Sequence, residues 1–418
     1  MHKRSFLLAA GGASLGLAFA DTRAVFAEEA QTPPGELARD EAFWAGVRAK
    51  YRLKPDYINL ENGYYCMQPT EVLEAFLERV REVNTEASYY MRTRQVEDKL
   101  RARKRLAALA GCSHEELIIT RNTTESLDTV IAGIDWKAGD EAVMAAQDYG
   151  AMLDMFALQA RRYGMLNKLV SLPLDPQTDE EIVELYARAL TPKTRLLMVC
   201  HMVNITGQIL PVRKIADMAH ARGVPVMVDG AHALAHIDFR IPDLGCDYYG
   251  TSLHKWLGAN LGAGALYVRK DRIAALWPIY GDRNFDDTDI AKLNHTGTHP
   301  VHTDLAIMNA IDFHESIGIG PKEARLRYLQ RYWTEKVRGT PNILLNTPRD
   351  PRRSCAIANV GVGTLKPADL ARILLEKYRV YTVAIDRANV QGVRVTPHLF
   401  TTTAELDTLV RALTELAA

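Results

Sequence analysis

The chain has 418 residues, of which 47% are hydrophobic and 24% are charged, so it has the composition of a globular protein with room for two or three units. Lys plus Arg and Asp plus Glu number 51 each, which leaves a formal net charge of +0 and no basic excess for binding nucleic acid. We therefore expect a small molecule as the partner.

Residues 1–27 have the pattern of an export signal. Lys3 and Arg4 form a basic start, an apolar stretch too short to span a bilayer follows, and small residues place cleavage after Ala20 or Ala27. The order Lys-Arg-Ser-Phe-Leu resembles a twin-arginine signal with lysine in the first basic position. We expect a periplasmic protein with no membrane span after cleavage, or a cytoplasmic one if this segment is a frayed amphipathic N-terminus.

Residues 67–300 have the pattern of a large α/β domain. From about residue 116, β-rich runs alternate with helical stretches, and these runs are ELIIT, EAVMA, NKLVSLPL, RLLMVCHM, PVMVDG, YYGTS and GALYVR. Amphipathic segments such as AMLDMFALQARRYG and VRKIADMAHARG lie between them, with Gly164 and Gly223 as helix stop signals. Continuous apolar strands separated by helices predict a mostly parallel seven-stranded sheet covered on both faces.

The pattern changes beyond residue 300. A long helical stretch, DLAIMNAIDFHESIG, leads to the apolar runs SCAIANVGV and GVRVTPHLF, with the helical segment DLARILLEKY between them and the helix AELDTLVRALTELA at the end. We therefore predict that residues 301–418 form a smaller α+β domain, which an N-terminal arm of residues 28–66 joins.

Polar side chains follow the predicted strands at the points where the strands end. In open parallel sheets, ligands bind at the carboxyl ends of the strands, so we expect these side chains to face one site. They are Asn122, Thr123, Thr124, Tyr149, Asn204, Asp229, His232, Ser252, His254 and Lys255. The set suits pyridoxal 5'-phosphate (PLP), which needs a lysine for a Schiff base, an acid beside its pyridine nitrogen and a helix N-terminus for its phosphate.

The motifs around these residues occur in the order found in a known family. From YINLENGYY to the C-terminus, the chain resembles fold-type I PLP enzymes of the class V aminotransferase family, and within it the isopenicillin N epimerase-like branch. This resemblance implies the PLP-dependent transferase fold (type I). It also implies that Lys255 binds the cofactor covalently, that Asp229 salt-bridges the pyridine nitrogen and that His232 lies near the phenolic oxygen, which makes these three the catalytic residues.

The resemblance assigns the other cofactor contacts as well. Asn204 would lie near the phenolic oxygen, and Tyr149 would stack on the ring face. The phosphate would be held by Thr123, Thr124, Ser252 and His254.

Two further positions match family residues outside this set. Thr298, in HTGTHP, matches a threonine that reaches the phosphate of the neighbouring subunit, which implies a homodimer. Arg394, in GVRVTPHLF, matches the arginine that grips a substrate carboxylate.

The chain departs from the family pattern at two places near its C-terminus. Residues 400–402 read Phe-Thr-Thr where the family often has Tyr-Asn-Thr. The loop VYTVAIDRANVQG has no cysteine where related cysteine desulfurases carry their sulfur-accepting cysteine. A persulfide mechanism is therefore not expected, since Cys355, in an apolar run, is no substitute.

Each site residue also has a plain structural interpretation. Taken singly, Lys255 is a strand-end surface residue, Asp229 a helix cap and Arg394 the partner of a structural ion pair. The histidines and Tyr149 are then core residues, Thr123 and Thr124 cap a helix, Asn204 is a turn residue and Thr298 belongs to a plain loop.

A metal site is not expected. His295, His299 and His302 lie close together in HTGTHPVH, but Gly297 and Pro300 break the helix that would place them on one face. The cysteines lack CxxC spacing and number 5, an odd count, so the sequence indicates neither a zinc site nor a disulfide framework.

The implied chemistry takes place at the α-carbon of an amino acid or of a metabolite that contains one. With Arg394 holding the carboxylate, Lys255 removes the α-proton. Return of the proton to the opposite face is epimerisation, its return to the cofactor leads to transamination, and loss of a β-substituent is lyase chemistry. The alternatives are a C–S or β-elimination lyase and an exported binding protein that has lost catalysis.

Overall fold

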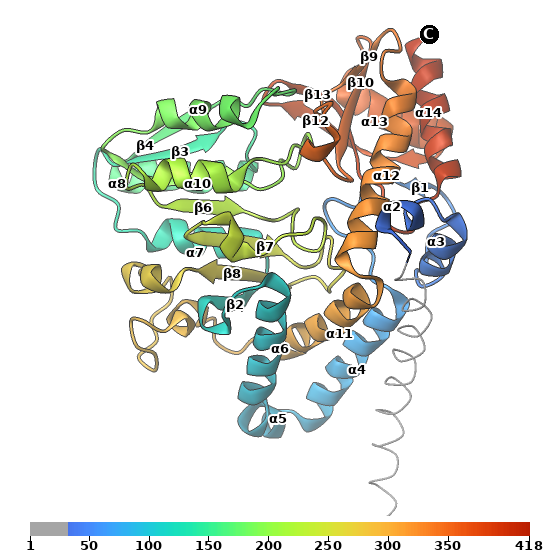
Figure 1. Ribbon diagram of the computed structural model, residues 1–418. Coiled ribbons are helices and arrows are strands. Elements are labelled where there is room, and N and C mark those ends of the chain that lie inside the picture. The colour runs from blue at the N-terminus through green and yellow to red at the C-terminus, as the bar shows by residue number, and fades with distance from the viewer. Residues whose placement is uncertain (1–31) are drawn as a thin grey trace, which may run out of the picture.

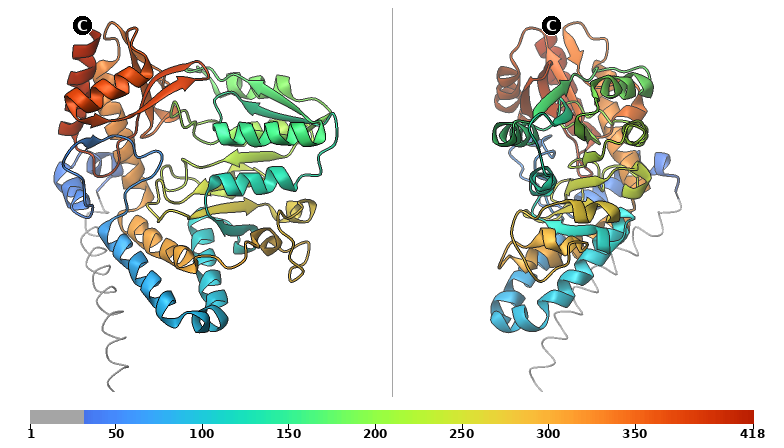
Figure 2. Two further views of the ribbon diagram at one scale, coloured as in Figure 1. Left: turned by 180° about the vertical axis from the view of Figure 1, so that it is seen from behind. Right: turned by 90° about the vertical axis from the view of Figure 1, so that its left-hand side faces the viewer.

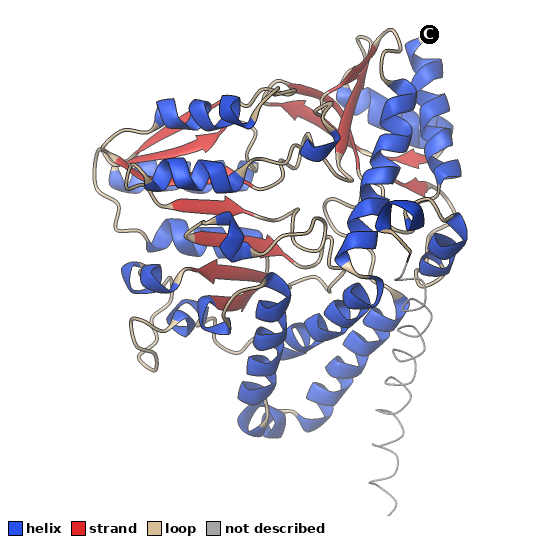
Figure 3. Cartoon of the chain, viewed as in Figure 1, coloured by secondary structure: helices blue, strands red, loops and turns tan. Residues whose placement is uncertain are grey.

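The computed structural model describes residues 32–418, so the export signal predicted for residues 1–27 lies outside the described residues. A broad sheet flanked by helices lies beside a smaller unit that contains the C-terminus (Figures 1 and 3). Within residues 32–418, no helix is long and apolar enough to cross a membrane.

The larger unit is built on a seven-stranded sheet with the strand order β2-β8-β7-β6-β5-β3-β4. All neighbouring strands from β7 to β4 are parallel, whereas β8 runs antiparallel to both β7 and β2. The seven predicted β-rich runs are thus confirmed as one mostly parallel sheet. Its strands are β2 (Leu117–Thr120), β3 (Glu141–Ala145), β4 (Leu166–Val170), β5 (Thr194–Cys200), β6 (Val226–Asp229), β7 (Tyr248–Ser252) and β8 (Gly264–Val268).

Helices cover both faces of this sheet, as the front and back views show (Figures 1 and 2). In β5, Leu196 and Met198 pack with α7 (Thr123–Gly133) and α8 (Gly150–Tyr163). Leu197 and Val199 point the other way, into the core that contains α9 (Asp179–Ala189) and α10 (Val212–His220). Burial on both faces is the reason that these strands are continuously apolar in the sequence.

The smaller unit is built on a four-stranded antiparallel sheet with the order β12-β13-β10-β9. Its strands are β9 (Ile343–Leu345), β10 (Ala358–Val362), β12 (Val383–Arg387) and β13 (Val390–Val395). β9, β10 and β13 share one core with the helices α12 (Ile319–Val337), α13 (Pro367–Tyr378) and α14 (Thr403–Ala417). A capping box between Thr402 and Glu405 begins the last helix.

The N-terminal segment contacts both units. Its elements are α2 (Pro34–Leu37), α3 (Glu41–Arg48) and β1 (Ile58–Asn59), and β1 pairs in parallel with β11 (Val380–Tyr381) of the smaller unit. In turn, α11 (Val301–Ile317) packs against α4 (Thr70–Glu86) and α6 (Gln95–Ala110) before α12 enters the smaller unit. The domain limits at residues 66 and 300 stay predictions.

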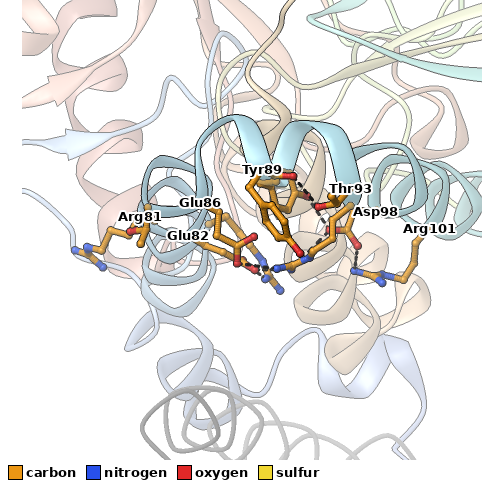
Figure 4. A network of polar contacts seen from close by, with 11 residues as sticks. Arg81, Glu82, Glu86, Tyr89, Thr93, Asp98 and Arg101 are labelled. Atoms are coloured by element: carbon orange, nitrogen blue, oxygen red, sulfur yellow. Dashed lines mark hydrogen bonds and ion pairs between the residues drawn. The ribbon is translucent and has the colours of Figure 1, made fainter. Parts of the chain in front are cut away.

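A helical corner that we did not predict projects below the sheet. It comprises α4, α5 (Ser88–Thr93) and α6 (Figure 1). Arg94 forms ion pairs with Glu82 (2.6 Å) and Glu86 (2.9 Å) on α4, while Asp98 on α6 accepts a hydrogen bond from the Tyr90 hydroxyl (2.7 Å). Figure 4 shows this network, which joins the three helices.

Short 3-10 helices complete the chain. The predicted stop at Gly164 is confirmed, because this residue ends α8 with a φ of 71°. The 3-10 helices are η1 (His114–Glu116), η2 (Ile241–Leu244), η3 (Lys270–Ala275), η4 (Ile290–Asn294) and η5 (Pro351–Arg353).

Candidate active site

A cavity of about 300 Å³ lies at the carboxyl ends of the central strands. Eleven of the twelve residues that the sequence analysis places at the site line it: Asn122, Thr123, Thr124, Tyr149, Asn204, Asp229, His232, Ser252, His254, Lys255 and Arg394. The twelfth, Thr298, lines an adjoining hollow of about 500 Å³. Arg121 and Gly262 border both spaces.

Lys255 occupies the turn that follows β7 and is half-buried. Its Nζ lies 3.1 Å from Nε2 of His232, which follows β6. Burial lowers the pKa of the Lys255 amine to about 8, although the nearby Asp229 carboxylate opposes this shift. At neutral pH, the fraction of uncharged amine is therefore larger for Lys255 than for a lysine in water.

Asp229 is the last residue of β6 and is 3% exposed. Its Oδ1 accepts a hydrogen bond from the backbone N–H of Ala231 at 3.0 Å. Burial raises the pKa of this carboxyl, although the Ala231 N–H and the charge of Lys255 oppose the shift, and within residues 32–418 it forms no ion pair. A cationic or N–H donor in the cavity would satisfy it.

The N-terminus of α7 also lines the cavity. Asn122 caps the helix by accepting the Glu125 N–H at 2.9 Å. The hydroxyls of Thr123 and Ser252 lie 2.7 Å apart, and the Thr123 N–H donates to Ser252 Oγ at 3.0 Å. A helix N-terminus with hydroxyl groups is suited to an anion such as phosphate.

His254 adds a polar atom to this end. Its Nδ1 is buried and has no hydrogen-bond partner within the described chain. Burial lowers the pKa of the imidazole to about 4, so the ring is neutral in the ligand-free protein. The orphaned nitrogen fits a site that is completed by a ligand.

Arg394 is held by a carboxylate that the sequence did not lead us to expect. Its Nε donates to Oε2 of Glu61 at 3.1 Å and its Nη2 to Oε1 at 2.5 Å, while Nη1 donates to the Asn204 carbonyl at 3.2 Å. The Arg394 and Glu61 side chains are only 8% and 5% exposed. Three of the five guanidinium N–H groups are thus used, which leaves two for a ligand.

Glu61 is a residue that the sequence analysis did not single out. It lies in the segment YINLENGYY, where the resemblance to the family begins. The backbone N–H of Tyr64 donates to Glu61 Oε1 at 2.9 Å. A Cβ at Gly63 would lie 3.0 Å from Arg394 Cζ, so glycine leaves room for the guanidinium. A carboxylate two residues after a short strand was the available signal.

Arg387 is a second residue that sequence reasoning missed. It lies on β12 and donates to the Asp148 carbonyl at 3.1 Å and to Asn204 Oδ1 at 3.4 Å. With its oxygen used in this way, Asn204 has its amide NH2 left to donate to a ligand. Tyr149, the residue before α8, lines the same side of the cavity and is 43% exposed.

Asp148, the residue before the cavity residue Tyr149, is a buried carboxyl. It is fully buried, and its Oδ2 accepts the Ala145 N–H at 2.8 Å. Burial raises the pKa of this carboxyl to about 7, and the charge of Asp229 adds to the shift.

Two histidines near Thr298 pair with aspartate side chains. His295 contacts Asp282 at 2.8 Å and His299 contacts Asp304 at 3.1 Å. In residues 32–418, no group of three or more His, Cys, Asp or Glu side chains could hold a metal ion.

Solved structures with the same fold define the class of protein. The apo cysteine desulfurase of Thermococcus onnurineus NA1 superimposes with a TM-score of 0.79 over 89% of this chain and 98% of that chain, at 21% identity. A C-DES variant with glycine covalently linked to its PLP cofactor also gives 0.79, over 88% of this chain and 99% of that chain, at 21% identity. At this identity, the likeness shows the fold alone, which is that of type I PLP enzymes.

Sequence comparison then gives the family. Residues 62–409 match the model for aminotransferase class-V. The chain is 32% identical to isopenicillin N epimerase of Amycolatopsis lactamdurans, over 90% of this chain and 98% of that protein. It is 26% identical to a probable cysteine desulfurase of Halalkalibacterium halodurans, over 76% of this chain and 80% of that protein. The chain therefore belongs to the class V aminotransferase family of PLP-dependent enzymes.

Proposed function

We propose that this protein binds PLP in the Lys255 cavity and acts at the α-carbon of an amino acid or of a metabolite that contains one. One observation supports this above all: an amine, a buried carboxyl that forms no ion pair within residues 32–418 and a hydroxyl-lined helix N-terminus face a single cavity. These are the groups that PLP needs for covalent attachment, for its ring nitrogen and for its phosphate.

The residues around the cavity fit the cofactor in their chemistry. Asp229 would pair with the ring nitrogen, and the orphaned His254 Nδ1 would contact the phosphate. The phosphate would also be held by Thr123, Thr124 and Ser252. Asn204 and His232 would serve the ring oxygen, and Tyr149 the ring face.

When bound, PLP supplies an electron sink for the charge that develops as a bond to the α-carbon breaks. Lys255 Nζ would accept the α-proton, for which a pKa of about 8 is well matched to neutral pH. The two N–H groups that Arg394 retains would orient the substrate carboxylate.

Among the possible reactions, we favour removal of the α-proton and its return to the other face. Two isopenicillin N epimerases match over 90% of this chain, at 32% and 29% identity. A persulfide reaction has less support, because burial holds the pKa of the Cys200 thiol in the cavity well above its usual range and the β12–β13 loop has no cysteine. Transamination is the second candidate, since it shares the first proton transfer.

Proton NMR in heavy water separates these reactions. The PLP-loaded protein is incubated with amino acids, peptides with a free α-amine and isopenicillin N, with and without a keto-acid acceptor. Loss of the α-proton signal with inversion and without a keto acid is the expected result. A keto acid that appears only with the acceptor indicates transamination, and no exchange with any substrate contradicts the proposal. Lys255→Ala is the control and is expected to show no exchange.

We further propose that residues 1–27 direct the protein to the periplasm. The basic start and short apolar stretch support this, together with the twin-arginine-like order. Cell fractionation tests it: a periplasmic protein that begins after Ala20 or Ala27 is expected, and a cytoplasmic protein with an intact N-terminus contradicts it.

A further inference from the structure

Trp256, the residue after Lys255, connects to the amine through His232. The indole Nε1 lies 3.3 Å from His232 Nδ1, and His232 Nε2 lies 3.1 Å from Lys255 Nζ. The three side chains therefore form one chain of hydrogen bonds that ends at the reactive amine.

Several contacts fix the indole. Its ring lies nearly parallel to that of His236, with centroids 3.6 Å apart, and to that of His398, with centroids 5.5 Å apart. The buried Lys322 amine donates to the Trp256 carbonyl oxygen. With 1% of its surface exposed, Trp256 has no room to turn its N–H elsewhere.

The direction of each hydrogen bond follows from donor chemistry. An indole Nε1–H can only donate, so His232 Nδ1 must be the acceptor and carry no proton. A neutral imidazole then has its one proton on Nε2, where it faces Lys255. Because an Nε2–H cannot accept, the Lys255 amine must accept, and only the uncharged amine has a lone pair to do so.

We propose that Trp256 is a positioning residue that fixes the Nε2–H tautomer of His232 and so presents Lys255 as a free amine. The link to catalysis rests on the proposed function. The tautomer of His232 and the protonation state of the Lys255 amine do not depend on it. The proposal gives a reason for the indole N–H of this buried tryptophan to contact His232 beside the reactive lysine.

The surrounding charges do not by themselves favour a free amine. Asp229 and Glu61 attract a proton to Lys255, whereas Arg394 repels it. His254 and Cys200 face the same space, and the Cys200 thiol is protonated. Burial also keeps the pKa of His232 well below its usual value, so the imidazole is neutral at pH 7. The tautomer of His232 decides whether its Nε2 can accept a hydrogen bond from Lys255 in the charged ammonium form.

The tautomer can be measured in the apo-protein by ¹⁵N NMR of histidine-labelled protein. His232 is assigned by the signal that disappears in His232→Gln. The parent is expected to show Nε2–H with an unprotonated Nδ1, and Trp256→Phe is expected to show a mixture of tautomers. An Nδ1–H tautomer in the parent protein overturns the proposal without any variant having to fold.

The state of the amine is measured by the pH at which Lys255 reacts. Apo-protein is mixed with PLP at pH 6 to 10: the amine nitrogen replaces the aldehyde oxygen, which leaves as water, and a hydride from borohydride fixes the new bond. Mass spectrometry of the peptide with residue 255 gives the rate. Trp256→Phe is expected to raise the midpoint by about one pH unit and to lower the rate at pH 7 roughly tenfold.

Trp136→Phe is the matched control. That indole is also buried, at 4% exposed, but it donates to the Ile131 carbonyl at 2.7 Å, outside the site. It is expected to leave the midpoint unchanged. If folded Trp256→Phe keeps the parental midpoint, the proposal is wrong, whereas failure of α-proton exchange with an intact tautomer would count against the proposed function alone.

Discussion

At the scale of single residues, the Glu61–Arg394 pair sets the charge of the site where the substrate carboxylate is proposed to bind. The pair is almost fully buried, so each charge depends on the other for compensation. Glu61 thus keeps Arg394 in place while it reduces the net charge that a substrate meets. A substrate must bind through the two remaining N–H groups.

Glu61→Gln separates these effects. It keeps the side-chain shape and one acceptor but removes the buried negative charge, so we expect the free energy of unfolding to fall by about 2–3 kcal/mol. Added acetate should restore stability to the variant more than to the parent, because an anion would replace the lost carboxylate. Denaturant unfolding with and without acetate measures both.

The control for this prediction is Glu86→Gln. Glu86 pairs with Arg94 at 2.9 Å, but the two side chains are 32% and 43% exposed. A change of less than about 1 kcal/mol is expected there. Equal losses at both positions, with no effect of acetate, would refute the account of Glu61.

Asp148 makes stability depend on pH. Its pKa of about 7 in the folded state lies above the unfolded value of about 3.9. Between these values the folded protein retains a proton that the unfolded chain releases, so stability falls as the pH rises, by up to about 1.4 kcal/mol per pH unit. Asp229 contributes in the same direction, since its pKa is also raised.

Asp148→Asn is expected to reduce this slope while retaining an acceptor for the Ala145 N–H. The free energy of unfolding is measured at pH 5, 6, 7 and 8 and should fall less steeply with pH in the variant than in the parent. At pH 8 the variant should therefore be the more stable of the two proteins. Parallel pH curves would show that Asp148 is ionised in the folded state at every pH tested.

At the scale of elements, the end of β7 and the start of α7 meet at Ser252 and Thr123. Ser252→Ala removes the acceptor for the Thr123 N–H and the hydroxyl that lies 2.7 Å from Thr123 Oγ1. We expect the affinity for PLP to fall roughly five- to tenfold, as for the loss of one or two hydrogen bonds. Fluorescence titration of apo-protein measures it.

Ser113→Ala is the control for this junction. Ser113 caps η1 by accepting the Glu115 N–H at 3.1 Å, away from the cavity. Its PLP affinity should match that of the parent. If Ser252→Ala also matches the parent, the phosphate does not lie at the N-terminus of α7.

The sheet and the strand-end residues could be predicted from the sequence because their signals are local. An apolar run marks each strand, and a parallel sheet brings Asp229 and Lys255 to one edge. The Glu61–Arg394 pair joins residues 333 positions apart, and the indole of Trp256 meets His232 across two loops. Such contacts depend on how loops and segments far apart in the chain pack together, which no local pattern specifies. The corner of α4, α5 and α6 was missed because we assigned no elements before residue 116.

At the scale of the whole molecule, the position of Thr298 outside the cavity is consistent with its proposed role toward a neighbouring copy. We expect a homodimer in sedimentation experiments, and Thr298→Ala should lower PLP affinity several-fold without changing the mass. A monomeric parent protein, or a dimeric Thr298→Ala variant that binds PLP with the affinity of the parent, would exclude this arrangement.

The central claim is that Lys255 holds PLP. The most direct test is to load the full chain with PLP, reduce it with borohydride and locate the added mass by peptide mass spectrometry. The account predicts one modification per chain on Lys255, with a visible absorbance band before reduction that Lys255→Ala lacks. A colourless protein, or label spread over surface lysines in both proteins, would contradict it.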